Sequence, residues 1–284
     1  KFEMKGSEKS RQSLLDECKM QFGTIASGSS GNCIYVGSDT TSLLVDVGIS
    51  GKRIEEGLRS IDHTTGDCDG ILITHEHSDH IKGLGVISRK HKIPIYCTRG
   101  TMEAMQSMSS LGKMPEGLFR PIEADKKFQI GDLQVQPFAI SHDAAEPVGY
   151  RINHGTKSAG IATDLGYYDD YIVQNLSGLD VLLLEANHDV NMLQVGSYPY
   201  YLKQRILGNR GHLSNETAGR LLCRLLHERM KAVFLGHLSR ENNYEALAYE
   251  TVCSEVTMGE NPWKSSDFKI AVAHREQVSD LVTV

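Results

Sequence analysis

Short apolar runs alternate along this chain with segments in which apolar residues recur at helical spacing, and the alternation predicts a mixed α/β fold. Buried strands are predicted at residues 21–25, 34–36, 42–48, 70–73, 92–97, 159–163, 181–184, 232–236 and 268–273. Helices are predicted at residues 50–60, from near residue 80, at residues 101–109 and after Ser214. Residues 128–138 alternate apolar and polar positions around a Gly-Asp turn, which is typical of a hairpin with one solvated face.

The bulk composition limits the class of protein. Residues 1–19 are polar and charged and are predicted to be an N-terminal extension, whereas residues 20–284 show no repeat or composition break and are predicted to form a single domain. No apolar run approaches the roughly 20 residues of a membrane span, so we expect a soluble, cytoplasmic protein without a membrane partner. The six cysteines form no Cys-x-x-Cys pair, which favours buried, reduced thiols. The formal charge of -6 argues against nonspecific attraction to polyanions, but bound cations can reverse the sign of the charge inside a cleft.

The candidate chemistry is concentrated in residues 74–80, directly after the strand predicted at residues 70–73. His75, His77, Asp79 and His80 fall within six residues, too close together to share one helical face, so we expect a loop wrapped around metal. One cation accepts only two or three ligands from so short a segment. We therefore assign His75 and His77 to one ion, and Asp79 and His80 to a second. The alternative is a polar surface loop that happens to be rich in histidine.

The pattern His-x-His-x-Asp-His after a strand resembles the signature of the metallo-β-lactamase superfamily. This resemblance implies an α/β fold, a single-domain αββα sandwich, with two divalent metal ions per chain, either zinc, manganese or iron. It also implies ligands from later strand ends: His142 for the first ion, Asp164 as a bridge and His237 for the second ion. At the end of the strand predicted at residues 42–48, Asp46 would hold the metal loop by hydrogen bonds.

The Gly/Ser-rich residues 26–32 can be a flexible turn, or a loop whose N–H groups and hydroxyls bind a phosphate. Ala-Ser-Gly-Ser-Ser-Gly-Asn resembles the opening of the YycJ/WalJ group within the same superfamily, cytoplasmic proteins regarded as DNA exonucleases. This likeness favours the second interpretation. It predicts that Ser29, Ser30 and Asn32 line the cleft and bind a substrate phosphate.

The order Glu185-Ala186, then residues 211–214 opening a helix, then residues 237–239 after a strand resembles the closing section of tRNase Z-type phosphodiesterases. By that resemblance His212, oriented by Glu185, would protonate the departing 3′-oxygen. Asp79, a ligand of the second ion, is also predicted to be catalytic. Two alternatives remain: His188 is the acid, or His212 only caps the following helix.

Together these features predict a two-metal phosphodiesterase that acts on nucleic acid as a 5′-to-3′ DNA exonuclease. The alternatives are a metallo-hydrolase of small thioesters or other esters and an RNA-processing nuclease. A metal-binding sensor without turnover is the alternative outside enzymes, and the complete set of seven expected ligands argues against it.

Overall fold

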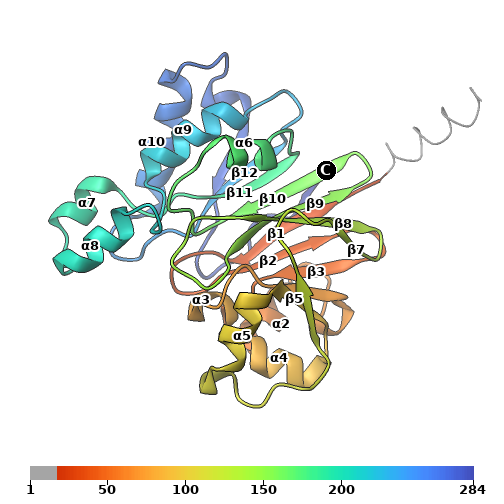
Figure 1. Cartoon of the computed structure of the whole chain (residues 1–284). Helices are drawn as coiled ribbons and strands as arrows, with labels where there is room; N and C mark the ends of the chain where they lie inside the picture. Colours follow the sequence, from red (N-terminus) through yellow and green to blue (C-terminus); the bar gives the residue numbers. More distant parts are fainter. Residues whose placement is uncertain (1–17) are drawn as a thin grey trace, which may run out of the picture.

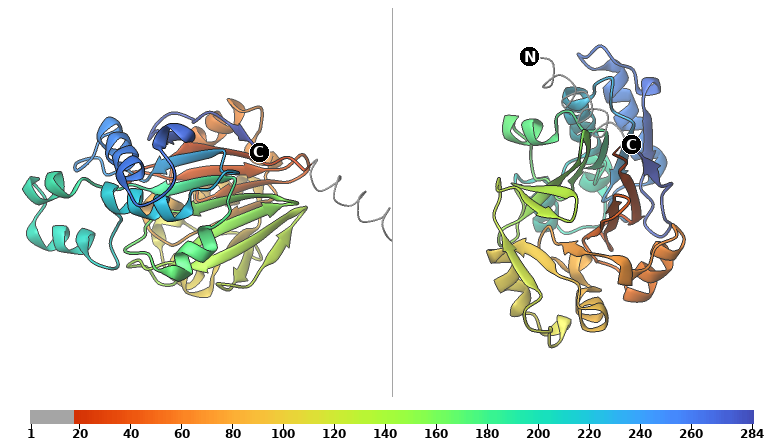
Figure 2. Two further views of the ribbon diagram at one scale, coloured as in Figure 1. Left: turned by 90° about the horizontal axis from the view of Figure 1, so that it is seen from above. Right: turned by 90° about the vertical axis from the view of Figure 1, so that its right-hand side faces the viewer.

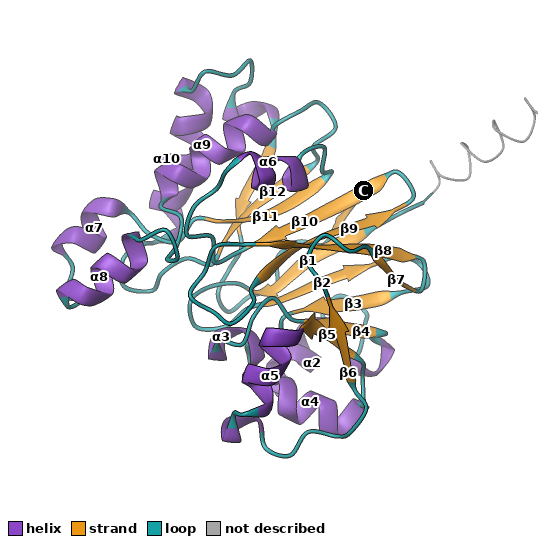
Figure 3. Ribbon diagram, viewed as in Figure 1, coloured by secondary structure: helices purple, strands orange, loops and turns teal. Residues whose placement is uncertain are grey.

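Short apolar runs form the strands of two seven-stranded sheets in the computed structural model, which describes residues 18–284 (Figures 1 and 3). The order in the first sheet is β14 (Val282–Thr283), β1 (Gln21–Ala26), β2 (Cys33–Gly37), β3 (Ser42–Val45), β4 (Gly70–Leu72), β5 (Ile95–Thr98) and β6 (Phe119–Ile122). The order in the second sheet is β13 (Lys269–Val272), β12 (Ala232–Gly236), β11 (Val181–Glu185), β10 (Lys157–Ala162), β9 (Val148–His154), β8 (Leu133–Ala139) and β7 (Phe128–Ile130). Each sheet is parallel on one side and antiparallel on the other.

Most of the helices cover the outer faces of the two sheets. Those described are α2 (Gly51–Arg59), α3 (Ser78–Ile81), α4 (Leu84–His91), α5 (Arg99–Gln106), α6 (Asp170–Leu176), α7 (Val190–Val195), α8 (Tyr200–Leu207), α9 (Asn215–Leu225) and α10 (Glu245–Met258). Capping side chains set two of the predicted starts, because the hydroxyls of Ser50 and Ser214 accept hydrogen bonds from backbone N–H groups in the first turns of α2 and α9. Among residues 18–284, no helix has both the length and the apolar character of a membrane span.

Three apolar layers hold the sheets and helices together. The central layer lies between the sheets, where the rings of Phe22 and Phe234 stack with their centroids 5.8 Å apart. A second layer packs α2, α4 and α5 on the first sheet, and a third packs α6, α9 and α10 on the second sheet. The leucines of α9 belong to this third layer, as their helical spacing indicates. The αββα sandwich expected from the sequence is confirmed.

Several element boundaries differ from the predicted ones. The strand predicted at residues 42–48 ends at Val45, because Asp46 adopts a left-handed φ of 58° that turns the chain out of the sheet. The helix predicted at residues 101–109 is α5, which begins two residues earlier behind the N-cap Thr98 and ends at Gln106. Residues 1–17 of the predicted extension lie outside the described part of the chain, while the Lys19 carbonyl already accepts a hydrogen bond from His154.

The parallel halves of the two sheets determine where chemistry can occur. The carboxyl ends of parallel strands meet at one edge of a sheet, so the loops after β3 and β4 lie together, as do those after β10, β11 and β12. The two sheets face each other, so these loop clusters meet at the same end of the sandwich. Figures 1 and 2 show α7 and α8 projecting from the body of the molecule beyond this end.

Candidate metal centre

Six strand ends deliver ionisable side chains to one buried cluster. They are Asp46 after β3, His75 after β4, His142 after β8, Asp164 after β10, Glu185 at the end of β11 and His237 after β12. All six are at most 2% exposed. Such a concentration of buried imidazoles and carboxylates is stable only when the groups pair with one another or bind cations.

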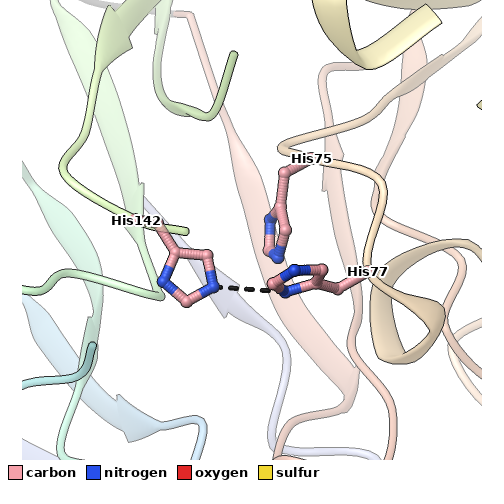
Figure 4. A group of neighbouring side chains, drawn as sticks. All are labelled: His75, His77 and His142. Atoms are coloured by element: carbon pink, nitrogen blue, oxygen red, sulfur yellow. Dashed lines mark hydrogen bonds between the residues drawn. The ribbon is translucent and has the colours of Figure 1, made fainter. Parts of the chain in front are cut away.

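One group consists of His75, His77 and His142, whose ring nitrogens lie within 4.8 Å of one another. Figure 4 shows the three rings turned toward a common point, with His142 approaching from the opposite sheet. The Nε2 atom of His142 is 3.2 Å from Nδ1 of His77. The structure therefore brings together the three imidazoles predicted for one ion.

A second group consists of Asp79, His80 and His237, again within 4.8 Å. Asp164 lies between the two groups. Its carboxylate is 3.1 Å from Nε2 of His80 and 3.2 Å from Nε2 of His237, and it is 3.5 Å from Nε2 of His142 in the first group. One carboxylate thus faces both predicted sets of ligands, which is the arrangement a bridging ligand needs.

Hydrogen bonds fix how several of these imidazoles are turned. Nδ1 of His80 lies 2.7 Å from the Asp46 carboxylate, and Nδ1 of His142 lies 3.2 Å from the Gly211 carbonyl. With Nδ1 as the donor in these contacts, Nε2 of each ring faces the cluster and is the atom that would bind a metal. Outer contacts of this kind are what orient metal-binding histidines.

Asp46 anchors the loop itself. Its carboxylate accepts hydrogen bonds from the backbone N–H and the hydroxyl of Thr74, both at 2.9 Å, in addition to the contact with His80. Close packing on the other side requires Gly48, because a Cβ there would collide with the Asp79 carbonyl. Asp46, Asp164 and His237 all have a left-handed φ, a strained conformation that concentrates at functional sites.

The charge states of the cluster suit a cation. Burial and the neighbouring His80 imidazole hold the pKa of His75 well below its usual value, so this ring is neutral. Burial opposes ionisation of Asp164, yet the surrounding imidazoles, led by His237, hold its pKa well below the usual range. Neutral imidazoles and ionised carboxylates are the forms that bind metals.

His80 is the exception among the imidazoles. Burial disfavours its charged form, but the carboxylates of Asp46, Asp164 and Asp79 outweigh burial and raise its pKa well above the usual value. A cation bound beside these carboxylates would compete with the proton on His80, so metal affinity at this position should depend on pH.

The atoms of the site that lack partners fit the same occupant. Within residues 18–284, Nε2 of His75 is buried and makes no hydrogen bond to the protein. An unpaired buried nitrogen is costly unless something binds it. Because it faces the other imidazoles of its group, a divalent cation with a preference for nitrogen and oxygen ligands fits the residues present.

His212 lies at the edge of the cluster, where it stays partly accessible, with 17% of its side chain exposed. Its Nδ1 is 2.7 Å from the buried Glu185 carboxylate, whose other oxygen accepts backbone hydrogen bonds from Leu165 and Leu213. Burial lowers the pKa of His212, but the charge and hydrogen bond of Glu185 overcome that effect and raise it to about 9.

His188, the alternative acid, has a different environment. It is 1% exposed, its Nδ1 contacts the Asn187 side chain at 3.3 Å, and burial together with the nearby His212 lowers its pKa to about 4. It is absent from the groups of potential metal ligands among residues 18–284, whereas His212 forms one with Asp164, Glu185 and His237. The environment of His212 is therefore the better suited to a proton donor.

The Gly/Ser loop lies against the second group of ligands, but its members differ in exposure. Ser29 and Ser30 are exposed, whereas Asn32 is fully buried. The Asn32 amide accepts a hydrogen bond from the Gly28 N–H, donates to the Gly28 carbonyl and lies 3.2 Å from Nε2 of His80. These contacts make Asn32 part of the frame that joins the loop to the cluster, a different position from the open cleft wall that the sequence suggested.

Two supporting residues were missed by sequence reasoning. Thr74 contacts Asp46, His75 and His80 through its hydroxyl, and Ser27 accepts a hydrogen bond from the His237 N–H. Thr74 directly precedes the histidine motif and Ser27 belongs to the Gly/Ser run, so their positions were the available signal. Threonine and serine occur in many structural roles, so their positions alone do not predict a contact with a metal site.

Comparisons with known proteins agree with this geometry. The family described as "Beta-lactamase superfamily domain" matches residues 41–235. Exodeoxyribonuclease WalJ of Streptococcus pneumoniae serotype 2 (strain D39 / NCTC 7466) is 42% identical over 246 residues, which cover 87% of this chain and 91% of that protein. Exodeoxyribonuclease YycJ of Bacillus anthracis is 40% identical over 241 residues, covering 82% of this chain and 88% of that protein.

Solved structures show the same fold at low sequence identity. The metallo-β-lactamase fold protein YhfI from Bacillus subtilis has a TM-score of 0.67 and 17% identity, with 93% of this chain and 99% of that chain covered. The short form of human tRNase Z has a TM-score of 0.61 and 17% identity, with 92% of this chain and 98% of that chain covered.

Proposed function

The chain belongs to the metallo-β-lactamase superfamily and, within it, to the family of the WalJ and YycJ exodeoxyribonucleases, and we propose that it is a metal-dependent DNA exonuclease. The observation that carries this proposal is the pair of His/Asp groups that share Asp164, in a chain similar to these exonucleases over most of its length. We also propose the cytoplasmic location expected from the sequence.

We propose two divalent cations per chain, either zinc, manganese or iron. His75, His77 and His142 would hold one, Asp79, His80 and His237 would hold the other, and Asp164 would contact both. Bound there, the cations would supply the Lewis acidity that activates water and neutralises charge on a phosphodiester. The carboxylates of Asp79 and the shared Asp164 favour hard oxygen-rich substrates such as phosphate esters.

The residues around the ligands would provide positioning and proton transfer. His212, held by Glu185, would donate a proton to the leaving 3′-oxygen, and the partial exposure of its ring leaves it accessible to a substrate. Ser29 and Ser30, exposed beside the second group, would bind a phosphate of the substrate through their hydroxyls and backbone N–H groups. Asn32 would support this loop from beneath and keep it against His80.

Digestion of end-labelled nucleic acids tests the function. The metal-loaded protein should release nucleotides progressively from DNA, and faster from 5′-phosphorylated ends if degradation proceeds 5′ to 3′. Preference for RNA would favour an RNA-processing nuclease, and cleavage of thioesters without cleavage of any nucleic acid would favour the small-ester hydrolase. Binding of metal without turnover of either class would leave a metal-binding sensor and overturn the proposal.

Variants at the second group separate fold from chemistry. Asp79→Ala should abolish phosphodiester cleavage while circular dichroism and thermal unfolding stay close to those of the unmodified protein, since Asp79 lies on the rim of the cluster and not in an apolar layer. Full turnover in this variant would contradict the assignment of Asp79.

A further inference from the structure

The two helices α7 and α8, with the loop between them, form a projection that we term the arm, residues 190–207 (Figures 1 and 2). It carries an unusual share of exposed apolar surface. Among the large hydrophobic residues exposed in the described chain, Val195 is 86% exposed, Tyr200 is 77%, Tyr201 is 74% and Leu207 is 41%. Neither Tyr200 nor Tyr201 makes a side-chain hydrogen bond within residues 18–284, so both rings are free to contact another molecule.

All charged side chains in the arm and in the segment that joins it to the cluster are positive. Residues 190–215 contain no aspartate or glutamate, although the whole chain contains 36 acidic residues and has a formal charge of -6. The same segment contains Lys203, Arg205 and Arg210. An apolar and aromatic surface without negative charge, in an acidic protein, is complementary to a polyanion with aromatic groups.

These cations also hold the arm in place. Lys203 donates hydrogen bonds to the carbonyls of Gln194 and Gly196, which ties α8 to α7 and the loop after it. Arg205 forms an ion pair with Asp143, the residue directly after His142. The orientation of the two helices is thus defined relative to the metal centre.

The arm is continuous with the candidate catalytic loop. Beyond the end of α8, the Asn209 carbonyl accepts a hydrogen bond from Ser141, and Arg210 donates two to the His142 carbonyl. The His212 N–H donates to the Ile206 carbonyl inside α8. At 1.5 Å per residue, the eight residues of α8 extend about 12 Å from this anchored end toward Tyr200. A molecule lying along α8 toward its last turn would therefore approach the loop that carries His212.

We propose that the arm binds the unpaired strand of a nucleic acid substrate, whose bases stack on Tyr200 and Tyr201 while its end enters the metal centre. This inference rests on the proposed nuclease function and names the form of substrate that the site receives. Exposed tyrosines provide a face for any base, so the arm gives affinity without sequence preference. A rigid ring also loses little conformational entropy on binding. The absence of acidic residues from the arm removes the charge repulsion that a polyanion would otherwise meet there.

Binding without turnover tests the proposal independently of the exonuclease activity. The probe is a fluorescently labelled 20-nucleotide oligo(dT), measured by anisotropy with the protein in excess chelator, so that no cleavage occurs. The variant Tyr200→Ala/Tyr201→Ala should bind the probe at least about tenfold more weakly, since base–aromatic stacking has effects of this size per ring. Tyr200→Phe/Tyr201→Phe retains the rings and should bind like the unmodified protein. Tyr249→Ala, on α10 and 38% exposed, is the matched control for loss of a surface tyrosine.

Duplex DNA of the same length with blunt ends provides the second comparison, because paired bases are not available for stacking. The double alanine variant should lose affinity for the single strand and much less for the duplex. Equal losses on both, or unchanged binding of the single strand, would overturn the proposal. Failure of the unmodified protein to bind any strand would also overturn it. If the unmodified protein were a dimer and the double alanine variant a monomer, the arm would be the contact between two copies of the chain, and the proposal would again be overturned. Strand binding that depends on the tyrosines, in a protein that cleaves no DNA when loaded with metal, would retain the arm and refute only the exonuclease function.

Discussion

Replacing Asp46 by Asn tests whether the carboxylate beneath the metal loop controls His80. Asn tolerates the left-handed φ of 58° at this position and has almost the same shape as Asp, so the backbone is left undisturbed. The substitution changes the atom that faces Nδ1 of His80. In the unmodified protein this nitrogen lies 2.7 Å from a carboxylate oxygen of Asp46. If the amide oxygen keeps the bond from the Thr74 N–H, the amide NH₂ points at His80, and two N–H groups would meet.

The expected response is a change of tautomer. In its neutral form His80 would carry its proton on Nε2, so that Nδ1 can accept from the amide, and Nε2 would present a hydrogen to the centre of the cluster instead of a lone pair. If His80 instead kept Nε2 free for a metal, its Nδ1–H would face the NH₂ of the new amide. Two donors would then meet at side chains that are 0% exposed in the unmodified protein. Losing a hydrogen bond to a buried carboxylate costs about 1.5–3 kcal/mol. We therefore expect metal affinity at this position to fall by about 10- to 100-fold, or about 1.4–2.8 kcal/mol.

Calorimetric titration of the metal-free protein with zinc measures this effect, with thermal unfolding as the check on the fold. Asp132→Asn is the matched control, because the Asp132 carboxylate likewise accepts hydrogen bonds through both oxygens, from the hydroxyls of Ser38 at 2.7 Å and Thr40 at 2.8 Å, in a hairpin outside the cluster. It should lose some stability and no metal affinity. Two equally tight zinc sites in Asp46→Asn, or an equal loss of affinity in Asp132→Asn, would refute the reasoning.

Three further predictions concern proton donation, the Gly/Ser loop and acid stability. His212→Ala should lower kcat on DNA by about 10²- to 10⁴-fold with metal content unchanged, and should lower it far less on bis(p-nitrophenyl) phosphate, whose leaving group needs no proton; similar losses on both substrates would exclude the general-acid role. Ser30→Ala should raise KM for 5′-phosphorylated DNA more than it lowers kcat, and an unchanged KM would leave the loop as a turn. Hydrogen bonds from the Thr65 side chain and N–H lower the pKa of Glu55 from 4.5 to about 2, so this contact stabilises the fold above about pH 4.5 and its contribution is lost as the pH falls toward 2. Glu55→Gln should therefore reduce the free energy of unfolding at pH 7. Between pH 4.5 and 2, the free energy of unfolding should fall less in this variant than in the unmodified protein, as chemical denaturation across this range can measure. Parallel curves for the two proteins would show that Glu55 contributes nothing to acid stability.

Local pattern predicted much of the architecture, and together with the superfamily resemblance it predicted the seven proposed ligands. Strand and helix periodicity depends on neighbouring residues only, so the runs that became β1, β4, β11 and β12 could be read directly. The histidine motif is equally local, since its members fall within one loop. His142, Asp164 and His237 each follow an apolar run, and the superfamily resemblance added them to the predicted ligands.

Only the tertiary structure decided contacts between segments far apart in the chain. Burial of Asn32 against His80, the contacts of Thr74 with His75 and His80, and the advantage of His212 over His188 all depend on how several loops pack together. Sequence spacing carries no information about which ring nitrogen faces a metal and which faces a carboxylate. The arm was missed for the related reason that exposure of Tyr200 and Tyr201 is a property of the folded surface, and the same residues in a sequence could equally have packed into an apolar layer.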